Sequence, residues 1–196
     1  MSTWPLITAR LAIRPVDASD LDAIWSYRGR PDVDLWLGGS VDRETITRRF
    51  LEPKAGRQQL SVLRDGHVVG DLMLVVQDAW SQVEVAEQGR ATRGLLGWAF
   101  HPDVSGRGLA TEAVGELIRH AFEDLGLRRV VAECFADNEP SWRLMERVGM
   151  RREAHHVRDS LHRTLGWQDE YVYALLAEEW RDRQAAPNVD ASITKR

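Results

Sequence analysis

The chain has 196 residues, of which 43% are hydrophobic and 29% are charged, and its formal net charge is −4. This size and balance are typical of one globular domain and exclude a disordered or membrane-spanning chain. The acidic balance argues against nucleic-acid binding, which needs clustered Lys and Arg. We expect one domain over residues 1–184, a disordered tail over 185–196 and, because the chain starts without an export pattern, a cytoplasmic location.

Cysteine and histidine contents indicate neither a disulfide nor a metal site. The single Cys134 cannot form an internal disulfide, and its apolar, strand-like neighbours predict a buried, reduced thiol. The six histidines lack the His-x-x-x-His spacing of a helical metal pair, and there is no second cysteine. His155 and His156 would point to opposite faces of a strand. We therefore expect no metal.

The N-terminal quarter of the chain predicts one strand and two helices. Residues 8–14 alternate in polarity as a strand does. Residues 17–27 and 43–51 carry apolar side chains at helical spacing. Two adjacent glycines and a proline predict that residues 29–42, between these helices, form a loop.

A hairpin, an excursion and a central strand are predicted next. Residues 59–63 and 68–76 flank Asp65-Gly66, a dipeptide typical of a tight turn because glycine readily accepts a positive φ. Residues 78–93 are polar and break the strand pattern, so we expect a long excursion, which in compact domains is often functional. The short apolar run over 95–100 predicts a central strand.

The C-terminal half predicts two strand–helix units followed by two more strands. From Leu109 to Leu125 apolar side chains recur at 3.6-residue spacing, and Gly126 is placed to end this helix. A strand over 129–135 precedes a helix whose first turn contains Pro140. The remaining predicted elements are strands over 150–157 and 170–176, joined by a polar loop, and a terminal helix over 177–183.

The segment with the strongest chemical signal joins the strand ending at Phe100 to the clearest helix. It reads SGRGLAT over residues 105–111. Backbone N–H groups at a helix start lack internal partners and bind phosphate oxygens, while glycines allow the ligand to approach. We predict a pyrophosphate site, with a plain tight turn as the alternative. Thr111 at the third glycine position disfavours a dinucleotide fingerprint, and no Gly-Lys-Ser or Gly-Lys-Thr exists for a Walker loop.

Together these motifs resemble the GNAT superfamily of N-acetyltransferases, especially its Rim-type branch. The resemblance spans roughly residues 8–181 and is carried by 8–15, 101–113, 138–150 and Trp180. It implies an α/β (α+β) fold with a mixed, mostly antiparallel sheet, helices on both faces, and a V-shaped split between the strands ending near Phe100 and Phe135. It also implies transfer of acetyl from acetyl-CoA to a primary amine, on a protein N-terminus or a small molecule, in a ternary complex.

The resemblance also assigns residues to acetyl-CoA. Amides of the 105–111 loop would hold the pyrophosphate, and the backbone of Ala99 and Phe100 would pair with the pantetheine arm. Asn138 and Ser141 would be polar groups on the cofactor side, with helix capping as the alternative. Arg143 would reach the adenosine phosphates, with a solvated surface charge as the alternative. The expected cofactor set is Ala99, Phe100, Ser105, Gly106, Arg107, Gly108, Leu109, Ala110, Thr111, Asn138, Ser141 and Arg143.

Catalytic groups carry less signal. Many family members have a Tyr seven residues after the helix-start Asn to protonate the leaving thiolate, and here that position is Met145. We predict that Ser141 supplies this proton, directly or through water, and that Met145 packs in the core. The family's frequent strand Glu has no counterpart, so no base is chosen. The conceivable ones are Asp71, Glu84, Glu87 and His101.

The acceptor is expected to meet three loops, 29–42, 78–93 and 156–168. Aromatic walls with carboxylates suit a cationic amine, and the alternative is that some of the tryptophans are core or dimer contacts. The residues in question are Trp36, Trp80 and Trp167, with Glu84, Glu87, Asp159 and Asp169. The expected partners are an amine acceptor and, with the choice between monomer and homodimer left open, a second copy of the chain. The competing hypothesis is a non-catalytic acyl-CoA-binding or regulatory protein that retains the cofactor loop.

Overall fold

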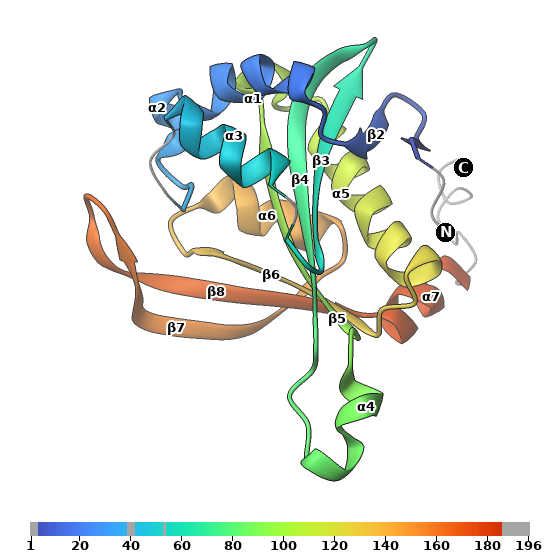
Figure 1. Ribbon diagram of the computed structural model, residues 1–196. Helices are drawn as coiled ribbons and strands as arrows, with labels where there is room; N and C mark the ends of the chain where they lie inside the picture. Colours follow the sequence, from blue (N-terminus) through green and yellow to red (C-terminus); the bar gives the residue numbers. More distant parts are fainter. Residues whose placement is uncertain (1–3, 39–41, 53, 186–196) are drawn as a thin grey trace, which may run out of the picture.

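The computed structural model describes residues 4–38, 42–52 and 54–185 (Figure 1). The predicted disordered tail falls outside these residues, apart from Ala185, which ends the last helix. Within the described ranges, no helix combines the length and the apolar character needed to span a membrane.

One eight-stranded sheet forms the centre of the molecule, in the order β1-β2-β3-β4-β5-β6-β8-β7. The strands are β1 (Leu6–Ile7), β2 (Ala12–Pro15), β3 (Arg57–Arg64), β4 (His67–Gln77), β5 (Arg93–Phe100), β6 (Arg129–Phe135), β7 (Arg151–His162) and β8 (Gly166–Leu176). Neighbouring strands are antiparallel except for β5 and β6, which are parallel. The predicted mixed, mostly antiparallel sheet is confirmed.

Helices cover both faces of this sheet. Along β4, Leu72 and Leu74 belong to the core that packs under α5, whereas Asp71, the residue before Leu72, bonds to α1, because successive strand residues face opposite sides. The helices are α1 (Leu21–Arg28), α2 (Pro31–Asp34), α3 (Arg43–Leu51), α4 (Ala86–Gly89), α5 (Leu109–Arg119), α6 (Glu139–Arg147) and α7 (Ala177–Ala185). A π-helical turn, His120–Asp124, prolongs α5, and Gly126 follows it with φ +67°.

The parallel pair β5 and β6 opens into a split. Only the first residues of each strand pair, Arg93–Leu95 with Arg129–Val131. Beyond Leu95 the pairing stops, and the two strands run on to Phe100 and Phe135. The β6-facing edge of the second half of β5 is therefore free of β6, as the resemblance implied.

The β7–β8 hairpin differs most from the sequence prediction. The polar loop expected over 158–169 is largely strand, because β7 continues to His162 and β8 starts at Gly166, which has φ +75°. Most side chains of β7 face solvent, so its sequence lacks the apolar alternation that marks a half-buried strand. The expected loop over 29–42 likewise contains α2. The strand predicted over 8–14 is strand only from Ala12, in β2, and β1 precedes the predicted range.

The excursion over 78–93 projects from the sheet. It contains a one-turn helix, Val83–Val85, and α4, and it leads into the start of β5 (Figure 1). The glycine loop follows the other end of β5, after Phe100. The excursion and the glycine loop therefore lie at opposite ends of the same strand.

Candidate active site

The glycine loop has the backbone conformation that its sequence requires. Gly106 and Gly108 both have φ +73°, in the left-handed region that glycine adopts most easily. Gly108 is the N-cap residue of α5, and no side chain caps this helix start. The first N–H groups of α5 are therefore available to an anion.

A clamp from the N-terminal segment holds this helix start. The Glu112 carboxylate accepts hydrogen bonds from the Thr8 hydroxyl at 2.6 Å, from the Arg10 backbone N–H at 2.9 Å and from Arg10 Nε at 2.6 Å. Arg10 also donates to the Arg107 carbonyl at 2.9 Å. Burial alone would raise the pKa of Glu112, but the bonds from Thr8 and Arg10 hold it below its usual range. The N-terminal residues and Glu112 are more than 100 positions apart in the chain, so no local sequence pattern indicates that they meet.

A cavity of about 840 Å³ lies along the loop and the first turns of α6. It is lined by most of the predicted cofactor set, namely Phe100, Ser105, Gly106, Gly108, Leu109, Ala110, Thr111 and Arg143. Arg107 is the member of that set which lines neither this cavity nor the second one described below. Its backbone carbonyl accepts a hydrogen bond from Arg10.

Two other arginines on α6 flank the same cavity. Arg143 is exposed, pairs with Glu139 at 2.5 Å and stacks over the Trp142 ring. Arg147 was not predicted. Its Nε lies 3.3 Å from the Thr111 hydroxyl and its side chain lines the cavity. The spacing of four residues places both arginines on one helix face.

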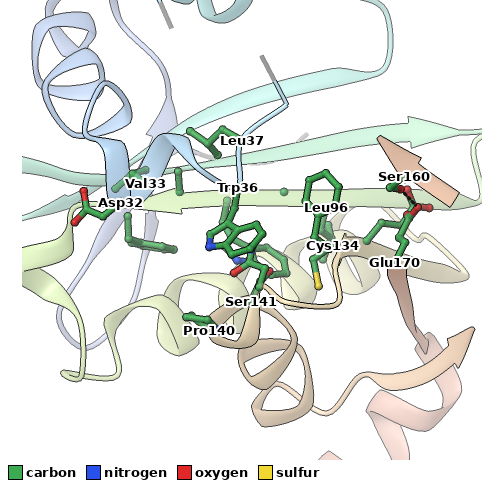
Figure 2. A pocket seen from close by; sticks show the side chains of 17 residues that line it. Asp32, Val33, Trp36, Leu37, Leu96, Cys134, Pro140, Ser141, Ser160 and Glu170 are labelled. Carbon is green, nitrogen blue, oxygen red and sulfur yellow. Dashed lines mark hydrogen bonds between the residues drawn. The ribbon is translucent and has the colours of Figure 1, made fainter. Parts of the chain in front are cut away.

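A second cavity, of about 450 Å³, occupies the split itself (Figure 2). Its walls come from Leu96–Phe100 of β5, Glu133–Phe135 of β6, the start of α6, the segment 32–37 and the β7–β8 hairpin. Trp98, Phe100 and Pro140 line both cavities, so the two adjoin. Among the described residues that line the second cavity there is no Lys, Arg or His.

The start of α6 brings Asn138 and Ser141 into the second cavity. Asn138 occupies the N-cap position without a side-chain capping bond, so capping does not account for its side chain. Burial raises the pKa of the Cys134 thiol to about 11 and outweighs the opposite effect of the neighbouring Ser141 hydroxyl. Cys134 is half-buried and protonated near neutral pH, which makes it a poor nucleophile. Met145 is buried in the core, as predicted.

None of the four conceivable bases lines the second cavity. Asp71 is buried and accepts hydrogen bonds from the Tyr27 hydroxyl at 2.6 Å and from Arg28 at 2.6 and 2.9 Å. His101 lines the first cavity, where its Nδ1 accepts from the Asp103 N–H. Glu84 and Glu87 lie in the excursion at the far end of β5.

The excursion, which was expected to border the acceptor, contributes no residue of 78–92 to either cavity. Trp80 at its base is 94% exposed and lines none of the cavities of the split. Of the three tryptophans, Trp36 lines the second cavity. Trp167 is 60% exposed on the hairpin.

Glu170 is one of three carboxylates that line the second cavity, with Asp32 and Glu133, and the sequence pattern did not reveal it. It lies on β8 directly opposite Phe135, lines the second cavity, and accepts a hydrogen bond from the Ser160 hydroxyl at 2.5 Å (Figure 2). Exposed His156 and Asp159 lie beside Glu170. Each of these three residues has one atom of a type that binds metals, and these atoms lie within 4.8 Å of one another. From the sequence, Glu170 was predicted only to begin a strand. The position of a residue in one strand does not show which cavity its side chain lines.

The sheet split between β5 and β6, with an uncapped helix start beside it, defines an α/β protein with N–H groups available to an anion next to the split. The family comparison agrees with this class. Residues 10–151 match the model described as an acetyltransferase (GNAT) domain. The chain belongs to the GNAT family of N-acetyltransferases.

Individual relatives match along nearly the whole chain. YdaF of Bacillus subtilis, named provisionally as a ribosomal N-acetyltransferase, is 35% identical over 183 residues, which cover 89% of this chain and 93% of YdaF. A GNAT-family acetyltransferase structure from Bacillus anthracis is 30% identical, with a TM-score of 0.73, covering 89% of this chain and 99% of that one. RimJ of Mycobacterium smegmatis, solved with CoA-disulfide, shares the fold at 22% identity and TM-score 0.71, covering 86% and 83%.

Proposed function

We propose that this chain transfers acetyl from acetyl-CoA to a primary amine, on a protein N-terminus or a small molecule, within a ternary complex. The observation that carries the proposal is the meeting of two cavities. One runs along the uncapped start of α5, and the other fills the split and reaches Glu170. Their shared lining at Trp98, Phe100 and Pro140 is where a thioester would meet an amine.

The described residues fit the cofactor. The N–H groups at the start of α5 suit the pyrophosphate, since helix starts favour anions, and Arg143 and Arg147 add positive charge. An added Cβ at Gly106 would meet nothing within 4 Å, so the loop leaves open space for a ligand. The free edge of β5 at Ala99 and Phe100 suits an extended chain with amides. When bound, acetyl-CoA supplies an activated acetyl thioester.

Glu170 is the residue we assign to the acceptor amine. Acetyl transfer requires a neutral amine, so a group in the cavity must take the proton of the incoming ammonium. The Glu170 carboxylate faces the cavity with no Lys or Arg beside it among the described lining residues. Trp36 and Phe135 supply apolar walls for a cation. Glu170 thus attracts the ammonium and accepts its proton.

Ser141 is the residue we assign to the departing thiolate. Its hydroxyl lies at the start of α6 in the same cavity. Its neighbour Cys134 stays a thiol and does not compete as an anion for the Ser141 proton. Ser141 therefore passes its proton to the departing sulfur, directly or through water, and takes up in turn the proton that the nitrogen of the tetrahedral intermediate loses.

The alternative function is a binding protein that has lost catalysis, and the presence of Met145 in place of Tyr favours this alternative. Turnover measurements decide between the enzyme and the binding protein. Thiol release from acetyl-CoA is measured across amines and N-terminal peptides. We expect release with at least one acceptor, together with a higher melting temperature in acetyl-CoA, because a ligand of the folded state stabilises it. Stabilisation without release on any acceptor supports the binding protein. No stabilisation contradicts both functions.

A further inference from the structure

The tip of the β7–β8 hairpin is tied to the segment that follows α1. Arg163 Nη2 donates to the Asp34 carboxylate at 2.5 Å and to the Asp34 carbonyl at 2.6 Å, and its Nη1 reaches the other carboxylate oxygen at 3.2 Å. His162 Nε2 lies 2.7 Å from the Leu35 carbonyl. We call Asp34, Leu35, His162 and Arg163 the clasp.

The neighbours of His162 select one tautomer of its neutral ring. Its Nδ1 accepts from the N–H groups of Thr164 at 3.2 Å and Leu165 at 3.1 Å. Nε2 must therefore carry the proton and donate to Leu35. The imidazole is buried, and both of its nitrogens have partners within the protein.

The ion pair of the clasp is less exposed than a typical surface pair and has two-point geometry. The Asp34 side chain is 22% exposed and that of Arg163 is 40% exposed. The guanidinium meets both carboxylate oxygens, and such two-point pairs are stronger and more directional than single contacts. The clasp is therefore expected to restrict the position of residues 32–37.

Trp36 connects the clasp to the cavity in the split. Its ring centroid lies 5.8 Å from that of His162 and 6.1 Å from that of Phe135, and Phe135 lies 5.2 Å from His162. Trp36 and Phe135 both line the second cavity, with Glu170 on the hairpin side (Figure 2). Displacing the hairpin tip from residues 34 and 35 would free the Trp36 wall.

We propose that the clasp sets the width of the acceptor opening, with His162 and Arg163 as positioning residues that act through Trp36. This inference rests on the proposed function. A cavity of about 450 Å³ must hold the acetyl thioester end as well as the acceptor amine. With the clasp closed, the acceptors admitted are slender primary amines on an unbranched carbon chain, and amines on wide, branched carbon frames are excluded.

The Arg163→Ala variant tests the clasp with two probes, butylamine and cyclohexylmethylamine. We expect the KM for butylamine to rise ~5- to 20-fold, since a two-point ion pair that orders a wall is lost. The KM for acetyl-CoA should stay within about twofold, because the start of α5 is untouched. The preference in kcat/KM for butylamine over cyclohexylmethylamine should fall. Arg163→Lys should keep part of this preference, since Lys retains the positive charge but lacks the two-point guanidinium contact.

The matched control is Arg43→Ala. Arg43 forms an exposed ion pair with Asp22, between α3 and α1, and lines neither cavity of the split. The Arg43→Ala substitution should leave the KM for butylamine, the KM for acetyl-CoA and the amine preference unchanged. Amide hydrogen exchange supplies a readout independent of turnover. Arg163→Ala should speed exchange over 33–37 without speeding it over 109–113.

The outcomes separate the clasp from the proposed function. An active wild type whose Arg163→Ala variant keeps its butylamine KM and its amine preference contradicts the clasp alone. Unchanged exchange over 33–37 contradicts it as well. A wild type that binds acetyl-CoA and acetylates no amine contradicts the proposed function instead.

Discussion

The two halves of the site are built in different ways. The cofactor half uses one strand–turn–helix unit, from Phe100 to Thr111, and contributes mainly backbone N–H groups at a helix start. The acceptor half uses side chains from segments far apart in sequence, such as Trp36, Phe135 and Glu170. Backbone-based sites depend on glycines and helix starts, whereas side-chain-based sites depend on tertiary contacts. Changes in the two halves should therefore alter different kinetic constants.

The largest expected effect lies in the acceptor half. Glu170→Gln removes the carboxylate but keeps a similar shape, so kcat/KM for the amine should fall ~10²- to 10³-fold as a general base is lost. The affinity for acetyl-CoA should change by less than about twofold. Initial-rate kinetics and a calorimetric titration measure the two quantities. The control is Glu87→Gln, on the excursion, and equal losses in both variants would remove Glu170 from the mechanism.

A change in the loop should show the opposite pattern. Gly108→Val places a branched side chain at φ +73° and disturbs the start of α5, so acetyl-CoA affinity should fall ~10- to 100-fold. Gly115→Ala on α5 is the matched control, because an added Cβ there meets nothing within 4 Å and Ala favours a helix. Calorimetry gives both affinities. An unchanged affinity for the Val variant would place the pyrophosphate elsewhere.

The clamp links the cofactor half to pH. The pKa of Glu112 is lower in the folded protein than its usual 4.5, so its contribution to stability is present above that value and is lost as pH falls through the folded pKa. Glu112→Gln should lower the free energy of unfolding by ~1 kcal/mol at pH 7, and by less as the pH approaches 3. Urea unfolding at both pH values measures this. If the free energies of unfolding of the wild type and the variant differed by the same amount at both pH values, ionised Glu112 would add no stability.

The smallest effect is expected in the excursion. Trp80→Ala removes a side chain that is 94% exposed and lies at the opposite end of β5 from the glycine loop. Both KM values should stay within about twofold of the wild type, because surface changes away from a site rarely alter it. Steady-state kinetics with the best amine suffices. A rise in the KM for the amine without a rise in the KM for acetyl-CoA would show that the excursion borders the acceptor site.

The same contrast explains what the sequence could predict. The SGRGLAT segment, the apolar spacing of α5 and the Asn138 helix start are local signals, and the fold and the cofactor cavity followed them. The exposed β7–β8 hairpin has no apolar alternation, so its length and Glu170 were missed. The role of Glu112 depends on Thr8 and Arg10, about a hundred residues away. Such contacts exist only in the folded chain.

A crystal structure with CoA and butylamine tests the central claim most directly. We expect pyrophosphate oxygens within hydrogen-bonding distance of the N–H groups at the start of α5, the sulfur beside Ser141, and the amine nitrogen near the Glu170 carboxylate. A pyrophosphate bound away from the glycine loop, or an amine bound outside the split, would contradict the account.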